Sequence, residues 1–129
     1  MAKLQYGGTF RSNTSQIEVQ LSLLTFEEDG VIIYYSPALD LSGYGKNNRE
    51  AKESFNIALE EFLQYTLNKA TLKSVLKNLG WKLSGKGKTI KYQQPFLDHM
   101  LAENKYLSSV VREKEFQRIN QTIYLPIAA

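Results

Sequence analysis

With 129 residues, the chain is long enough for one domain, or for one domain with an extension. Its 43% hydrophobic content indicates a packed core, and the absence of cysteine excludes disulfides, zinc–thiolate sites and thiol nucleophiles. The first eight residues lack the apolar segment of a signal peptide, and no run approaches the roughly 18 apolar residues of a membrane span. We therefore expect a cytoplasmic protein that does not enter a membrane.

Charge divides the chain into two unlike halves. Residues 1–66 carry five Lys or Arg and nine Asp or Glu, whereas residues 67–129 carry eleven and four. An acidic half suits a basic protein partner, and a basic half suits nucleic acid or an acidic protein. The alternative is that each half has a solvated surface of one sign.

A strand and a hairpin are predicted near the start. Residues 17–23 alternate apolar and polar side chains, the pattern of a half-buried strand, and Leu24 and Phe26 break the alternation. Asp29-Gly30 tolerates the positive φ angles of a tight hairpin turn. The return strand, residues 31–35, is apolar on both faces, so one face should meet helices and the other a second layer or a dimer partner.

The return strand should end near Ser36, because Pro37 cannot donate a ladder hydrogen bond. A short third strand is expected within residues 39–45. If the apolar strand meets a second copy in a homo-oligomer, the candidate interface residues are Ile32, Tyr34 and Tyr44.

A long amphipathic helix follows. Asn47, with Glu50 three residues later, resembles a capping box, and the helix should end near Asn68. Helical spacing predicts a buried stripe that covers one face of the sheet: Ala51, Phe55, Ala58, Phe62 and Tyr65.

The second half predicts shorter elements. Thr71 is the expected cap of a helix over residues 72–79, and Gly80 is its expected C-terminal glycine, with Trp81 packing back. Residues 81–83 and 89–92 should form a hairpin with a basic tip. Two helical stretches, 96–103 and 106–113, and a last strand at 123–127 complete the prediction, and Pro126 favours an edge position for that strand.

The segment from Phe26 to Leu39, with its acidic turn and its Pro37-Ala38-Leu39 element, resembles the start of the HicB-like antitoxin family. The match continues through Gly43-Tyr44-Gly45 and the Glu50-Ala51 pair into the long helix, and covers about residues 17–66. The resemblance implies a partial RNase H-like fold, a three- or four-stranded sheet with a helix packed on it. It also implies oligomerisation and neutralisation of a small basic mRNA-cleaving toxin of the HicA type.

Many members of that family also bind operator DNA through a C-terminal helix-turn-helix or ribbon-helix-helix, but residues 67–129 do not match a ribbon-helix-helix. The fold class we expect is α+β. It comprises a HicB-like domain over residues 1–66, with an antiparallel-containing sheet and a long amphipathic helix, and a basic helix-hairpin-helix-strand extension over residues 67–129.

Catalysis is not expected. A metal nuclease needs carboxylates that converge on its ions, and the candidates scatter over a strand, a turn and a helix cap: Glu18, Glu27, Glu28, Asp29, Asp40 and Glu50. His99 is the single histidine and has no triad around it. Residues 84–89 have the composition of a phosphate loop but not its spacing. We therefore predict no catalytic residue, metal or cofactor.

Two binding functions stay open. In the first, the acidic half binds a basic toxin, with transcriptional autoregulation as a further role; a solitary HicB-like protein of another role is its variant. In the second, the basic half binds DNA or RNA through the hairpin, near Trp81 and Tyr92. The candidate nucleic-acid-binding residues are Lys82, Lys86, Lys88 and Lys91.

Overall fold

A computed structural model describes residues 16–86 and 89–126 of the chain. The predicted α+β class is confirmed: a four-stranded antiparallel sheet packs with helices, and a second sheet has two strands. In chain order the elements are β1 (Gln16–Glu28), β2 (Val31–Ser36), β3 (Leu41–Gly45), α2 (Asn48–Asn68), α3 (Leu72–Asn78), β4 (Lys82–Ser84), β5 (Lys91–Gln93), α4 (Leu97–Glu103), α5 (Lys105–Glu113) and β6 (Phe116–Pro126).

The large sheet has the strand order β3-β2-β1-β6. Its first hairpin is the predicted one: Asp29 and Gly30 have φ angles of 54° and 79°, both in the left-handed region that a two-residue hairpin turn requires. β1 pairs with β2 only from Leu24 to Glu28, whereas it pairs with β6 from Gln16 to Phe26. β1 and β2 are therefore the inner strands, and β6 is an edge strand, as Pro126 indicated.

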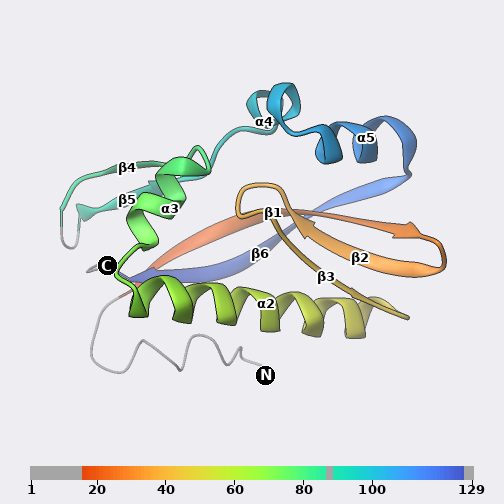
Figure 1. Ribbon diagram of the computed structural model, residues 1–129, viewed down its shortest axis with the longest axis horizontal. Coiled ribbons are helices and arrows are strands. Elements are labelled where there is room, and N and C mark those ends of the chain that lie inside the picture. The colour runs from red at the N-terminus through yellow and green to blue at the C-terminus, as the bar shows by residue number, and fades with distance from the viewer. Residues whose placement is uncertain (1–15, 87–88, 127–129) are drawn as a thin grey trace.

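α2 covers one face of this sheet (Figure 1). The predicted cap is confirmed, since the Glu50 amide donates to Asn47 Oδ1 at 2.9 Å, and Glu50 Oε1 accepts from the Lys46 amide. The apolar stripe is only partly as predicted: the fully buried apolar positions are Ala51, Phe55, Leu59 and Leu63. Tyr65 is 63% exposed and lies on the outer side.

β3 approaches α2 so closely that a side chain at Gly43 has no room. A Cβ there would collide with the backbone nitrogen of Phe55. This contact locks the edge of the sheet against the first half of the helix, which explains why glycine occupies the position.

α4 and α5 cover part of the opposite face (Figure 1). Leu24, Phe26 and Tyr35 face this layer, where they pack with Leu107 and Val110 of α5. The break in alternation at Leu24 therefore marks the point from which both faces of β1 pack against apolar side chains.

The second apolar face of β2 is thus covered within the chain rather than by a partner. Tyr34 is 8% exposed and belongs to the core on the α2 side, and Ile32 packs against that core. This placement corrects the prediction that Tyr34 forms an oligomer interface. Tyr44 lies on β3 with 65% of its surface exposed, so its role as a contact residue stays a prediction.

α3 ends as the sequence indicates. The Trp81 amide donates to the Leu76 carbonyl, and the Gly80 amide to the Lys77 carbonyl, which is the Schellman pattern with Gly80 at φ 99°. The start differs from the prediction, because the Thr71 side chain makes no capping hydrogen bond.

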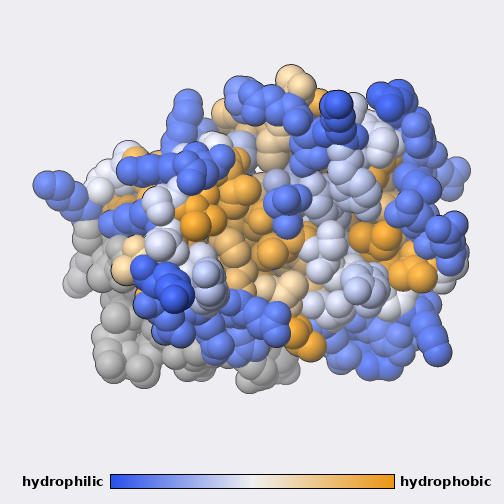
Figure 2. Space-filling model, viewed as in Figure 1, coloured by the Kyte–Doolittle hydropathy of each residue, from blue (hydrophilic) through white to orange (hydrophobic). Residues whose placement is uncertain are grey.

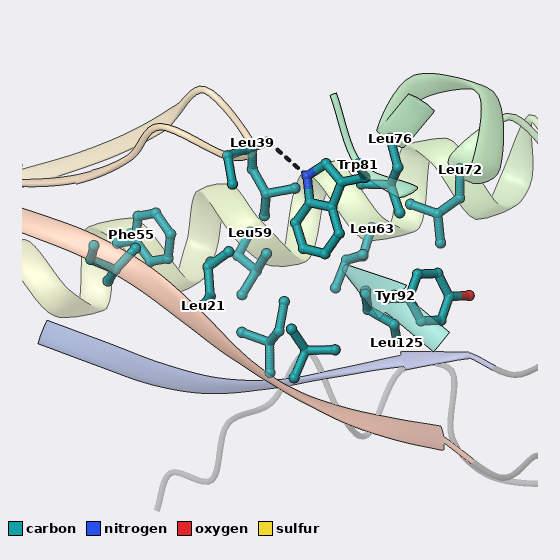
Figure 3. Close-up of a cluster of buried hydrophobic side chains, with 14 of the residues drawn as sticks. Leu21, Leu39, Phe55, Leu59, Leu63, Leu72, Leu76, Trp81, Tyr92 and Leu125 are labelled. Carbon is teal, nitrogen blue, oxygen red and sulfur yellow. Dashed lines mark hydrogen bonds between the residues drawn. The ribbon is translucent and has the colours of Figure 1, made fainter. Parts of the chain in front are cut away.

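Trp81 then enters the core, where its Nε1 donates to the carbonyl of Ala38 at 2.8 Å (Figure 3). Figure 3 also places Tyr92 and Leu125 beside Leu63 in this cluster. The hairpin β4–β5 that follows Trp81 is confirmed, with Leu83 opposite Tyr92. Its tip includes residues 87 and 88, which lie outside the described residues.

β6 corrects the predicted division at residue 66. It begins at Phe116, seven positions before the predicted start, and pairs with β1 throughout. The main core also mixes the two halves, with Leu21 and Phe55 packed in one cluster with Trp81 and Ile123. Residues 67–129 therefore complete the sheet and its core rather than forming a separate extension.

Candidate functional site

A groove of about 670 Å³ lies between the start of β1 and the hairpin β4–β5. Ile17, Glu18 and Gln20 form one wall. The other wall comes from β5 and the segment that follows it, including Phe96, which is 69% exposed. The groove also has three cationic side chains: Lys82, Lys91 and Arg118.

Two of the four predicted nucleic-acid-binding lysines, Lys82 and Lys91, line this groove. Lys86 is exposed near the hairpin tip, and Lys88 lies outside the described residues. The structure therefore brings two of the four to one site and adds Arg118, which the sequence analysis missed. Nucleic-acid binding by these residues stays a prediction.

The outer side of α2 offers a second candidate surface. Glu53, Ile57, Glu61 and Tyr65 are all exposed and recur at every fourth position, so they follow one line along the helix. Ile57 and Tyr65 expose 58% and 63% of their surface. We call these four residues the outer stripe of α2.

Figure 2 shows the chemical setting of this stripe. Hydrophilic residues line most of the coloured part of the lower margin, where α2 lies in Figure 1, and apolar residues form a band across the middle of the molecule. Within the stripe, Glu53 forms an exposed ion pair with Arg49, one turn earlier, at 3.4 Å. Such an exposed pair contributes little to stability, about 0.3–0.5 kcal/mol, so it leaves Glu53 available to a partner.

A third feature is a buried phenol beside a cleft of about 490 Å³. Tyr35 is 2% exposed; its hydroxyl donates to Asp40 Oδ1 at 3.2 Å and accepts from Asn104 Nδ2 at 2.8 Å. Its ring meets that of Tyr106 edge-on, with centroids 5.1 Å apart. Burial raises the pKa of Tyr35 from 10.0 to about 12, and the Asp40 carboxylate acts in the same direction. The hydroxyl therefore stays protonated at neutral pH and ties the 37–40 turn to α5.

We expect this phenol to make stability fall at high pH. The unfolded chain releases the Tyr35 proton near pH 10, whereas the folded protein holds it until about pH 12, so ionisation favours unfolding as the pH rises. The free energy of unfolding should drop by on the order of 2 kcal/mol between pH 10 and 12 because of this residue. Urea unfolding of wild type and Tyr35→Phe across this range checks it: equal losses in the two proteins would contradict the account.

The acidic residues considered for a metal site do not converge. Glu50 is held by the helix cap, Glu28 pairs with Lys114 at 3.8 Å, and Asp40 binds Tyr35. Within residues 16–86 and 89–126, no group of three or more His, Asp or Glu side chains could hold a metal ion. His99 is exposed on α4, where it lines the cleft beside Tyr35 with Glu103.

Comparison with family models, with curated proteins and with solved structures finds no match in any of the three. In the described part of the chain, no helix has both the length and the apolar character needed to cross a membrane. The function is therefore inferred from the surfaces described above.

Proposed function

We propose that the protein is a non-enzymatic, HicB-like antitoxin-type protein that binds and neutralises a small basic mRNA-cleaving protein of the HicA type. The outer stripe of α2 is the observation that carries this proposal. It alternates carboxylates with large exposed apolar side chains, Ile57 and Tyr65. A surface that combines apolar area with negative charge suits a basic protein, because burial supplies affinity and charge supplies orientation.

The stripe is presented on a rigid element. α2 has 21 residues, and four apolar side chains on its inner side are fully buried in the core. The stripe from Glu53 to Tyr65 spans about 18 Å at 1.5 Å per residue. A partner that docks there orders little of this protein, and a pre-organised surface loses less entropy on binding.

The order of the elements supports the family assignment. β1, the Asp29-Gly30 turn, β2, β3 and α2 follow one another over residues 16–68, in the order that the resemblance implies. The acidic character continues at the end of the first hairpin, where Glu27 and Asp29 are exposed. Glu27 and Asn48, at the start of α2, line one shallow pocket, so this end of the sheet lies near the helix.

The proposal is tested by growth. We expect the reading frame beside the gene for this protein to encode a small basic protein; a neighbour of another kind would count against the proposal. That protein is expressed alone in a bacterial host, where we expect growth arrest, and then with this chain, where we expect growth to resume. The variant Glu53→Lys/Glu61→Lys should fail to restore growth, because it places positive charge against a basic partner.

The matched control is Glu103→Lys/Glu113→Lys, which makes the same charge change at two exposed positions on α4 and α5, away from the stripe and from the pocket that Glu27 lines. It should restore growth as wild type does. If both variants restored growth, the outer stripe of α2 would not be part of the interface with the partner. The absence of arrest by the basic protein, or arrest that wild type does not relieve, would refute the antitoxin function itself.

A further inference from the structure

β1 has one long edge that no described strand covers. β6 pairs with one side of the strand from Gln16 to Phe26, but β2 pairs with the other side only from Leu24 to Glu28. Among residues 16–86 and 89–126, no strand pairs with the β2-side edge over residues 16–23. We call this stretch the open edge of β1. A backbone edge of this kind is a template for another strand.

A side chain already occupies part of the place that a strand would take. Gln94 Nε2 donates to the carbonyl of Gln20 at 2.6 Å, and Gln94 Oε1 accepts from the Ser22 amide at 3.2 Å. One side-chain amide thus supplies a donor and an acceptor to the two backbone groups that a neighbouring strand would otherwise bond. The backbone groups of Gln20 and Ser22 therefore point toward the open edge, and so do those of Glu18, two positions earlier.

The 670 Å³ groove continues from this point along the strand. Ile17 and Val19 side chains face α2, whereas Glu18 faces the other way, yet all three residues line the groove. A groove that touches both faces of a strand follows its edge rather than covering one face.

β5 forms the opposite wall and is held at a fixed place. Tyr92 OH donates to the carbonyl of Pro126, the residue opposite Gln16, whereas Gln94 reaches Gln20 and Ser22. β5 and the residues after it therefore run past the open edge in the same direction as β1. A strand added between them would therefore have the same orientation relative to both.

The side chains around the groove select the chemistry of its occupant. Lys82, Lys91 and Arg118 give it three positive charges, against the single carboxylate of Glu18. Exposed Phe96 adds an apolar contact at the end near α4. An extended peptide that carries acidic and apolar residues is complementary to this set.

We propose that the groove binds an extended acidic peptide segment of a partner protein, which adds to the open edge of β1 as a further strand. The backbone edge favours a peptide over a nucleic acid, because bases and phosphates cannot continue a strand ladder. The site uses β1, β5 and Arg118 rather than the outer stripe of α2, so it stands independently of the antitoxin proposal.

The test uses the full chain and an eight-residue peptide of alternating valine and glutamate, blocked at both ends and labelled for fluorescence anisotropy. The same peptide with lysine in place of glutamate, and a single-stranded oligothymidylate, are the comparison probes. We expect the glutamate peptide to bind and the lysine peptide not to bind. Lys91→Glu/Arg118→Glu should weaken the binding at least about tenfold, whereas Lys73→Glu/Lys77→Glu, on exposed positions of α3, should not change it.

Strand addition is separated from simple charge attraction at Glu18. Glu18→Pro removes an amide that faces the groove, and Glu18→Ala removes the same side chain but keeps the amide. We expect the Ala variant to bind at least as tightly as wild type and the Pro variant to lose binding at least about tenfold. Circular dichroism and urea unfolding of each variant serve to check that it is folded before its binding is compared.

Equal binding by the two folded Glu18 variants would overturn strand addition. Tighter binding of oligothymidylate than of the glutamate peptide would assign the groove to nucleic acid instead. No binding of the glutamate peptide at about millimolar concentration would overturn the proposal. None of these results bears on the growth assay, so the two proposals fail separately.

Discussion

Replacement of Trp81 by alanine is expected to lower the free energy of unfolding by about 3–5 kcal/mol. Trp81 is 3% exposed and packs in the main core against residues of α2, α3 and β5 (Figure 3). Its removal would leave a cavity at the junction of these elements. Since a domain has only about 5–15 kcal/mol of stability, urea unfolding followed by far-ultraviolet circular dichroism should show the loss as a much lower midpoint.

Trp81→Phe is the matched control for this effect. Phenylalanine keeps most of the buried apolar volume but leaves the Ala38 carbonyl without the indole donor. A loss of about 1–3 kcal/mol is expected, smaller than that of the alanine variant. If Trp81→Ala and Trp81→Phe unfolded at the same urea concentration as wild type, Trp81 would not anchor the hairpin β4–β5 to the sheet.

A fragment of residues 1–66 is expected not to fold. It would lose β6, the partner of β1 from Gln16 to Phe26. It would also lose seven buried core residues: Leu72, Leu76, Trp81, Ile90, Tyr92, Ile123 and Leu125. These side chains close the space between α2 and the sheet, so their absence exposes apolar surface that the fragment cannot bury.

The measurement is a ¹H–¹⁵N correlation spectrum of the fragment beside that of the full chain. We expect narrow amide dispersion for residues 1–66 alone and wide dispersion for residues 1–129. A fragment with the dispersed spectrum of a folded protein would restore the division at residue 66 and contradict the single core.

Local signals in the sequence predict local structure well in this chain. Asp29-Gly30, the pair Asn47 and Glu50, and Gly80 each act over four or five residues, and the structure has the expected turn, helix start and helix end at these places. Each signal depends on a backbone conformation or a hydrogen bond between near neighbours. Distant packing therefore has little influence on it.

Features that depend on distant partners were missed. The first part of β6, from Phe116 to Thr122, has no apolar alternation of its own, and becomes a strand because β1 pairs with it over its whole length. Tyr65 satisfies helical spacing for the inner side of α2, but Leu59 and Leu63 occupy that side instead. The side of a helix that becomes buried is set by the sheet on which it packs. The sequence of the helix alone does not determine this side when several apolar stripes are possible.

For the two candidate surfaces, the sequence predicted the sign of the charge but not every residue that forms them. Charge in the two halves predicted the sign of each: Glu53 and Glu61 on the outer stripe of α2, and Lys82 and Lys91 in the groove. No sequence pattern pointed to Gln94 or Arg118. Gln94 contributes to the groove because its amide bonds the backbone of β1, more than 70 residues away in the chain. Arg118 lines the groove because β6 pairs with β1, where Arg118 lies opposite Leu24.

The most direct test of the proposed docking surface is a nuclear magnetic resonance titration of the ¹⁵N-labelled full chain with the small basic protein that we expect to be encoded beside it. We expect the largest shift changes at residues 53–65 of α2. Ile57→Asp should weaken binding at least about 30-fold, as expected for a central interface residue worth about 2 kcal/mol. Unchanged α2 resonances at saturating partner, or shifts confined to β5 and the start of β1, would contradict it.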